Sequence, residues 1–350
     1  MSVDPSTGVA LQRLVAELER GIAPLDLRRW TLCVAGERIA VHAGVGAVAL
    51  LESMEALRTA DLAASSLQLF VIDGRSDGIA LPDTVVTRRH GFPPGGLGAF
   101  SAEGIHAFYQ PHAGVLSVLD APKRRAWCWV RDVTALPYYE FAAPLRHLLQ
   151  WWIVGRGGAL VHSAAVGTSE GGALIVGPSG SGKSTTALAC LEAGLSFAGD
   201  DYVLIAPGEP PTVHMAYATA KIVRDALPRH AHYADYFRNL GNVDEKPMLF
   251  MHEAAPAALL RSFPLRALVL PVVARVAKTR IVPAAPADVL RALAPSSVML
   301  FPLAGSLAFR RIAAWCRTLP CFRAELGDDP RDVGTAFATW LSRDFERVRP

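Results

Sequence analysis

The sequence predicts a two-domain α/β protein, in which a small α+β domain precedes a larger domain with a mixed sheet and flanking helices. The chain has 350 residues, a common length for two domains. Strand-like and helix-like segments alternate through its second half, which is typical of a layered α/β domain. One of those strands runs into a glycine-rich loop that opens a helix. We expect the first domain over residues 1–137 and the second over residues 138–350.

Composition and charge exclude several classes of protein. Hydrophobic residues make up 51% of the chain, enough for a sizeable core, and the net charge of +3 comes from interspersed acids and bases rather than a clustered basic face. The N-terminus does not read as a signal peptide, and the longest weakly polar stretch, residues 39–51, is too short to span a bilayer. The five scattered cysteines contain no CxxC pair. We therefore expect a cytoplasmic protein that binds neither nucleic acid nor membrane.

The first domain is predicted to begin with a helix and to continue as short strands. Apolar residues recur at helical spacing over residues 8–20. Residues 73–104 are rich in Gly, Pro and Asp and predict a loop. Strands are expected within 30–42, on both sides of a turn at Gly36-Glu37, and at 67–72, 105–110, 115–119 and 126–130.

The second domain is predicted to mix strands and helices, apart from one stretch with weak signals. Strands are expected at 159–166, 173–176, 196–198, 202–205, 267–273 and 280–282. Helices are expected at 138–154, 183–193, 286–294, 304–318 and 330–346. Residues 206–260 are broken up by prolines and show little periodicity, so they form either a mobile lid for acceptor recognition or a helical insertion.

The glycine-rich loop matches the phosphate-binding pattern GxxxxGK[ST]. It reads Gly177-Pro178-Ser179-Gly180-Ser181-Gly182-Lys183-Ser184, with an apolar strand before it and a helical run after it, as the motif requires. Its glycines let backbone N–H groups point at an anion, and the helix that follows adds its positive end. Lys183 reaches the β- and γ-phosphates, and the Ser184 hydroxyl is a magnesium ligand. We predict that this loop, together with Thr185, binds ATP with Mg²⁺.

Two adjacent carboxylates, Asp200 and Asp201, follow soon after the loop helix. One can hold Mg²⁺ directly or through water, and the other can accept the proton of an attacking hydroxyl. An Asp-Asp turn between strands is the alternative, but the nearness of the phosphate loop favours the catalytic interpretation. The sequence does not decide which aspartate is the base, and the working assignment places Asp201 with Ser184 on the metal.

A run of these residues resembles the HPr kinase/phosphorylase family and its relatives. The resemblance rests on His162-Ser163-Ala164-Ala165-Val166, on the phosphate loop and on Gly199-Asp200-Asp201-Tyr202-Val203, and it covers residues 159–206. Residues 319–326 are similar to the closing strand of such relatives. The resemblance implies a P-loop kinase domain of the HPr kinase type, with Lys183, His162 and both aspartates at the reacting phosphate. It also implies a hydroxyl acceptor, serine in the family, and assembly as a homo-oligomer.

The sequence leaves the acceptor open. The chain lacks the Glu-x-Arg-Gly segment that the family carries after the aspartate pair. The acceptor is therefore left open as a peptide, a protein or a small molecule. The first domain is a candidate for recognising this acceptor or a leader segment of it. Lys221 and Lys246 either add cations near the γ-phosphate or are ordinary surface lysines. Arg224 and Arg229 give weaker signals of the same kind. The pair His230/His232 could suggest a metal site, but no carboxylate or cysteine ligands accompany it at a suitable spacing. An ATPase or an ATP-sensing module is the alternative to a kinase.

Overall fold

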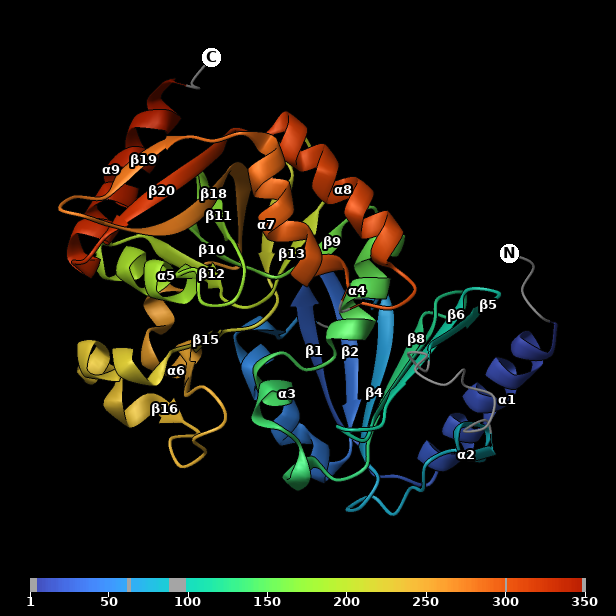
Figure 1. Cartoon of the computed structure of the whole chain (residues 1–350). Coiled ribbons are helices and arrows are strands. Elements are labelled where there is room, and N and C mark those ends of the chain that lie inside the picture. The colour runs from blue at the N-terminus through green and yellow to red at the C-terminus, as the bar shows by residue number, and fades with distance from the viewer. Residues whose placement is uncertain (1–4, 62–63, 88–98, 300, 348–350) are drawn as a thin grey trace. The chain divides into compact units, whose positions relative to one another are not determined.

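The computed structural model describes residues 5–61, 64–87, 99–299 and 301–347, and the chain divides into two compact units (Figure 1). One unit is Met1–Gly155 with Phe301–Ala304, and the other is Arg156–Leu300 with Gly305–Pro350. The division at Gly155 lies beyond the expected boundary at residue 137. The reason is that α3 (Tyr138–Ala142) and α4 (Arg146–Gly155) pack on elements of the first unit. Both units are mixed α/β structures.

The first unit is built on a mixed eight-stranded sheet with the order β3-β1-β2-β4-β8-β7-β6-β5. The pairs β2–β4 and β4–β8 are parallel and the other neighbours are antiparallel. The strands are β1 (Arg28–Val34), β2 (Glu37–Ala43), β3 (Arg58–Thr59), β4 (Leu67–Asp73), β5 (Ala99–Ala102), β6 (Ile105–Gln110), β7 (Val115–Asp120) and β8 (Arg125–Val130). The six strands expected from the sequence are therefore confirmed, as β1, β2, β4, β6, β7 and β8.

Helices pack on both faces of this sheet. On one face, α1 (Pro5–Ile22) and α2 (Asp83–Thr87) contribute to a core that includes Leu14, Leu18 and Trp127. On the other face α4 contacts β7, and the His147 ring lies 4.8 Å from the Phe108 ring between centroids. The 3₁₀ helices η1 (Val45–Leu57) and η3 (Val133–Ala135) complete the unit.

Two sequence expectations in this unit are wrong in detail. The helix expected over residues 138–154 is two helices, because Pro144 disfavours helical backbone at Ala143, which has φ −142° and ψ 66°, and Leu145 adopts a φ of 60°. The loop expected over 73–104 contains α2 and β5, which are too short for a periodic signal, and residues 88–98 lie outside the described residues.

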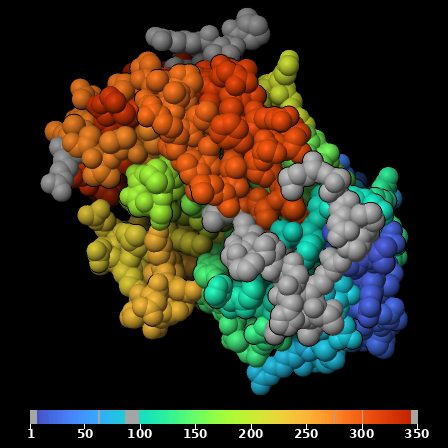
Figure 2. Space-filling model, turned by 45° about the vertical axis from the view of Figure 1, so that its right-hand side comes forward, coloured from blue at the N-terminus to red at the C-terminus, as the bar shows by residue number. Residues whose placement is uncertain are grey.

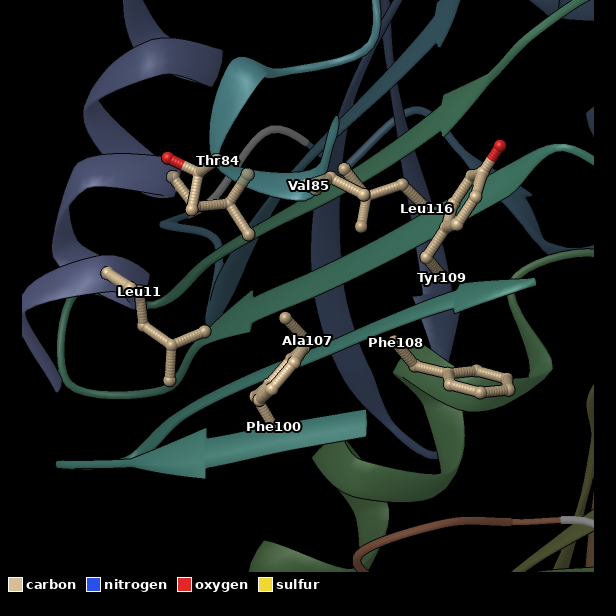
Figure 3. Close-up of a pocket in the computed structure, with 10 residues that line it drawn as sticks. Leu11, Thr84, Val85, Phe100, Ala107, Phe108, Tyr109 and Leu116 are labelled. Atoms are coloured by element: carbon tan, nitrogen blue, oxygen red, sulfur yellow. The ribbon is translucent and has the colours of Figure 1, made fainter. Parts of the chain in front are cut away.

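An apolar cavity lies between α1, α2 and the strands β5, β6 and β7. Figure 3 shows Leu11 of α1 and Val85 of α2 among its lining side chains, together with Ala107 and Leu116 of the sheet. The described residues that line it include no charged side chain.

The second unit contains a nine-stranded sheet whose main path is β12-β10-β11-β18-β14-β13-β9, with β20 paired to β18 and β19 paired to β20. The long strand β18 (Ser262–Val276) pairs in parallel with β11 and β20 and antiparallel with β14. The other strands are β9 (Ala159–Val161), β10 (Ser163–Thr168), β11 (Gly171–Val176), β12 (Ser196–Gly199), β13 (Val203–Ala206), β14 (Thr212–Met215), β19 (Arg280–Pro283) and β20 (Cys321–Gly327).

Four longer helices accompany this sheet. They are α5 (Lys183–Glu192), α7 (Pro286–Val298), α8 (Gly305–Thr318) and α9 (Pro330–Arg347). Helix α5 packs on α9 and helix α7 packs on α8. Gly334 allows the close approach of α9, because a Cβ there would lie 2.1 Å from the carbonyl oxygen of Ala189 in α5. The position of α5, which follows the phosphate loop, therefore depends on α9.

Much of the segment that the sequence left open, residues 206–260, forms a second, small sheet. Its order is β15-β17-β16, with β15 (Thr219–Lys221), β16 (Phe237–Arg238) and β17 (Met248–Phe250). The irregular 3₁₀ segment η4 (Arg224–Tyr236), the helix α6 (Met251–Ala254) and η5 (Pro256–Ala258) accompany it. In Figure 2 the yellow and gold atoms of this segment form a lobe. Among the described residues, none of the helices is both long enough and apolar enough to cross a membrane.

Candidate active site

The phosphate loop joins a buried strand to a helix. Residues 177–182 connect β11 to α5, so the strand and helix expected on either side of the loop are present. Gly180 and Gly182 have φ values of 83° and 97°, which residues that carry a side chain rarely adopt. Gly182 is also the N-cap residue of α5. A Cβ on Gly182 would also meet the Leu326 side chain at 3.2 Å. The loop therefore needs glycine here to turn its N–H groups toward one point.

Lys183, the first residue of α5, is folded back onto this loop. Its Nζ donates to the carbonyl oxygens of Gly177 at 2.7 Å and Pro178 at 3.0 Å, and the residue is 7% exposed. Burial lowers the pKa of its ammonium group, while Asp200 and Asp201 act in the opposite direction. The cation is thus held in the loop and can exchange carbonyl oxygens for phosphate oxygens without a large movement.

His162 lies where two antiparallel ladders are interrupted. The single strand expected over 159–166 is two strands, because β9 pairs with β13 while β10 pairs with β12. The gap between β9 and β10 is His162, and the gap between β12 and β13 holds Asp200, Asp201 and Tyr202. The N–H of His162 leaves the ladder and donates to Ser297 Oγ of α7 at 2.9 Å. The interruption therefore brings the histidine and the aspartate pair together.

Asp201 lies between the side chains of His162 and Lys221. Its Oδ1 lies 2.8 Å from His162 Nε2, and its Oδ2 accepts from Lys221 Nζ at 2.5 Å. Burial alone would raise the pKa of Asp201, but the charge of Lys221 and the His162 contact outweigh it, so the net shift is downward. Its φ of 72° is left-handed, a conformation that Asp tolerates better than most residues. Asp201 is therefore held as a carboxylate.

Asp200 has a different environment. It is 1% exposed, its side chain is hydrogen-bonded to that of Ser184, and Oδ2 accepts from the Lys221 N–H at 3.1 Å. Burial and the neighbouring Asp201 raise its pKa. The working assignment placed Asp201 beside Ser184, whereas in the structure it is Asp200 that bonds the Ser184 hydroxyl. The pKa values of the two carboxyl groups are thus shifted in opposite directions, an arrangement often found at catalytic sites.

A pocket with about 690 Å³ of empty space brings most of the expected side chains together. The expected residues among those that line it are His162, Ser179, Gly180, Gly182, Lys183, Ser184, Thr185, Asp200 and Asp201. Gly177, Pro178 and Ser181 belong to the loop but are not among the residues that line the pocket. Lys221 and Lys246, which the sequence left open, also line it.

Sequence reasoning missed three residues that line this pocket, Leu188, Ile222 and Val223, and it gave His230 only a weak signal. Leu188 lies in α5 and the other two directly follow β15, and no local pattern marks these three residues. Arg224 instead supports the lobe, donating to the carbonyl oxygens of Leu240 at 3.0 Å and Glu245 at 3.3 Å. Arg229 is exposed and is not among the residues that line the pocket.

Comparisons with known proteins include a weak structural similarity. No protein-family model matches the chain, and no curated protein matches it. Among solved structures, the chain is similar to the Hpr(Ser) kinase/phosphatase from Coxiella burnetii, with 10% identity, a match that covers 54% of this chain and 96% of that chain, and a TM-score of 0.28. The proposal below therefore rests on the residues of this chain.

Proposed function

We propose that this protein is a kinase that transfers the γ-phosphoryl group of ATP to a hydroxyl group of a peptide, a protein or a small molecule. The observation that carries the proposal is the meeting of Lys183 and Ser184 with two carboxylates of opposite pKa shift in one pocket. Phosphoryl transfer needs phosphate-binding cations, a metal and an oriented nucleophile, and few other reactions need all three in this arrangement.

A hard divalent cation suits the residues beside Lys183. Asp200 is a buried carboxylate whose bonded partners, the Ser184 hydroxyl and a backbone N–H, are neutral. Its pKa is raised because burial and the charge of Asp201 outweigh these hydrogen bonds, and a cation would stabilise the ionised form further. Oxygen ligands of this kind are the ones that Mg²⁺ prefers. Ser184 and Asp200 would therefore hold Mg²⁺, which would neutralise charge on the phosphates.

Asp201 is the residue that we assign to the acceptor hydroxyl. Lys221 and His162 hold it ionised, so it can accept a hydrogen bond from the hydroxyl and orient the oxygen for in-line attack. The lowered pKa of Asp201 is compatible with this role. In a loose transition state the carboxylate mainly positions the nucleophile, and early removal of the proton is less important. His162 and Lys221 are then positioning residues that act through Asp201.

Lys246 supplies a further cation to the same pocket. It is exposed, it lines the pocket, and its charge acts on Lys183. A cation there would help to stabilise the charge that develops on the transferred group. This supports the interpretation of Lys246 as part of the site rather than as an ordinary surface lysine.

The test is mass spectrometry of acceptors incubated with the protein and Mg·ATP. The panel contains free serine, serine-ended peptides and an HPr-type protein, with Lys183→Ala as the control. We expect one acceptor to gain a phosphate, and the gain to vanish in the control. Asp201→Asn should lower kcat by about 10²–10⁴-fold, and Asp200→Asn should raise the Mg²⁺ concentration needed for half-maximal rate.

Two other outcomes would point to a different function. If ADP forms and no acceptor in an extended panel gains mass, the protein is an ATPase. If ATP binds and neither product appears, it is an ATP-sensing module. In both cases Asp201→Asn would leave ATP binding intact, so the binding and transfer steps can be judged separately.

A further inference from the structure

The pocket extends beyond the phosphate loop along α5 into a more apolar region. Leu188 lies about one helical turn after Ser184, which is a distance of roughly 6 Å along the helix axis. Leu188 is 1% exposed and Ile222 is 3% exposed, and Val223, which is 46% exposed, also lines the pocket. A lining of this type, with a small number of polar groups, suits a flat organic ring rather than another phosphate.

His230 supplies a polar group in that region. It is 2% exposed, and it lies at a kink in η4, where its backbone is non-helical with φ −116° and ψ 32°. Its Nδ1 lies 3.3 Å from Oε1 of Glu192, the last residue of α5. Its Nε2 is buried and has no hydrogen-bond partner among the residues that the structure describes. A buried ring nitrogen without a partner is costly unless a bound molecule satisfies it.

The contact with Glu192 determines which nitrogen carries the proton. A carboxylate only accepts hydrogen bonds, so the proton of a neutral ring lies on Nδ1 and Nε2 is left as an acceptor. Burial lowers the pKa of His230, against the opposing effect of Glu192, and the charges of His232 and Arg229 lower it further. The ring is therefore neutral at pH 7, and its free nitrogen seeks an N–H or O–H donor.

We propose that Leu188, Ile222, Val223 and His230 form the subsite for the nucleoside base and that His230 Nε2 accepts a hydrogen bond from the 6-amino group of adenine. This inference rests on the proposed function, since it assumes that the phosphates of the nucleotide lie on the 177–184 loop. A base with oxygen at position 6, as in hypoxanthine or guanine, would place an acceptor against an acceptor. The Glu192–His230 pair would thus select ATP over ITP and GTP.

The test compares ADP with IDP, which share ribose and phosphates and differ at the 6-position and N1 of the base. Calorimetric binding with Mg²⁺ is measured for both, together with inorganic tripolyphosphate, which lacks a base. We expect the wild-type protein to bind ADP about tenfold more tightly than IDP, the effect of about one hydrogen bond. Tripolyphosphate should bind to the wild-type protein, and this binding should be lost in the Lys183→Ala variant.

Three variants locate the selectivity. His230→Phe keeps a ring of similar size without the nitrogen, so its ADP/IDP ratio should fall to about one. Glu192→Gln lets an amide donate to Nδ1, which leaves the proton on Nε2, so its preference should shift toward IDP. His232→Phe is the matched control, because His232 also approaches Glu192, at 3.6 Å, but it is exposed and is not among the residues that line the pocket. Circular dichroism checks that each variant is folded.

Equal binding of ADP and IDP by the wild-type protein would overturn the inference, as would a ratio in His230→Phe that matches the wild type. If tripolyphosphate still binds in either case, the phosphate site stands and only the base subsite is wrong. A protein that binds none of the three probes would contradict the proposed function itself.

Discussion

Asp200 and Asp201 show how neighbours in sequence can have opposite electrostatic roles. Asp201 forms two close contacts with basic side chains, at 2.8 and 2.5 Å, whereas the partners of Asp200 are neutral donors. The difference arises because the left-handed backbone at Asp201 turns successive side chains in different directions. The sequence predicted the pair and its chemistry, but the contacts that separate the two roles involve Lys221, 20 residues further on.

Replacing each aspartate by asparagine should therefore change stability in opposite directions. At pH 7 without Mg²⁺, Asp201→Asn should destabilise the second unit by about 1–3 kcal/mol, because it removes charge-assisted hydrogen bonds. Asp200→Asn should raise the melting temperature by a few degrees, because it removes a buried carboxylate whose ionisation is unfavourable. Thermal unfolding followed by circular dichroism measures both. Destabilisation by both substitutions to the same extent would contradict the assignment.

The stability changes caused by Asp200→Asn and Asp201→Asn should depend on pH for opposite reasons. The folded-state pKa of Asp200 is raised above 3.8. The ionised Asp200 therefore lowers the folding stability as pH rises through the raised value, and this destabilisation is complete above that value. The folded-state pKa of Asp201 is lowered, so its contribution is present above 3.8 and is lost as pH falls through the lowered value. On acidification, the stabilisation by Asp200→Asn should therefore vanish before the destabilisation by Asp201→Asn.

Secondary-structure elements could be predicted where the hydrophobic pattern continues over many residues. They could not be predicted where a single residue interrupts an element. The hydrophobic pattern of residues 159–166 is that of one strand, and it predicted the strand without the break at His162. The break follows from pairing with strands 29 to 46 residues away and from the bond to Ser297, which no local pattern encodes. The small sheet of the 206–260 segment was missed because its strands are only two or three residues long.

At the scale of elements, the packing of α9 on α5 should control the position of the phosphate loop. Gly334→Ala places a Cβ against the Ala189 carbonyl oxygen, so the two helices must separate. Overpacking of this kind costs about 1–3 kcal/mol, which exceeds the gain of about 1 kcal/mol in helix propensity. We expect a lower melting temperature and weaker nucleotide binding. Thr335→Ala, an exposed neighbour in the same helix, is the control, and equal effects of the two would contradict this packing argument.

At the scale of the whole molecule, the chain returns to its first unit after forming most of the second. Residues Phe301–Ala304 belong to the first unit, where Phe301 is 2% exposed and Trp151 Nε1 donates to the Pro302 carbonyl oxygen at 2.8 Å. The sequence placed the domain boundary at residue 137, 18 residues before the division at Gly155. It did not indicate this return, because the segment is four residues long and its partners lie about 150 residues away.

Removal of the Phe301 ring should therefore destabilise the first unit. Phe301→Ala creates a cavity next to His147 and should cost about 3–5 kcal/mol. Tryptophan fluorescence during denaturation reports mainly on this unit, because it contains Trp30, Trp127, Trp129, Trp151 and Trp152. Leu303→Ala, at a residue that is 43% exposed in the same segment, should have little effect. An unchanged fluorescence transition in Phe301→Ala would show that the segment does not support the unit.

The central claim is that residues 177–184 hold the phosphates of ATP, and calorimetric titration of the protein with Mg·ATP tests it most directly. We expect one saturable site in the wild-type protein and binding at least about 100-fold weaker in Lys183→Ala, because the variant lacks the charge-assisted hydrogen bonds to the phosphates. Lys278→Ala, at an exposed lysine of the same unit, should bind like the wild type. Equal binding by the wild type and Lys183→Ala would contradict the account.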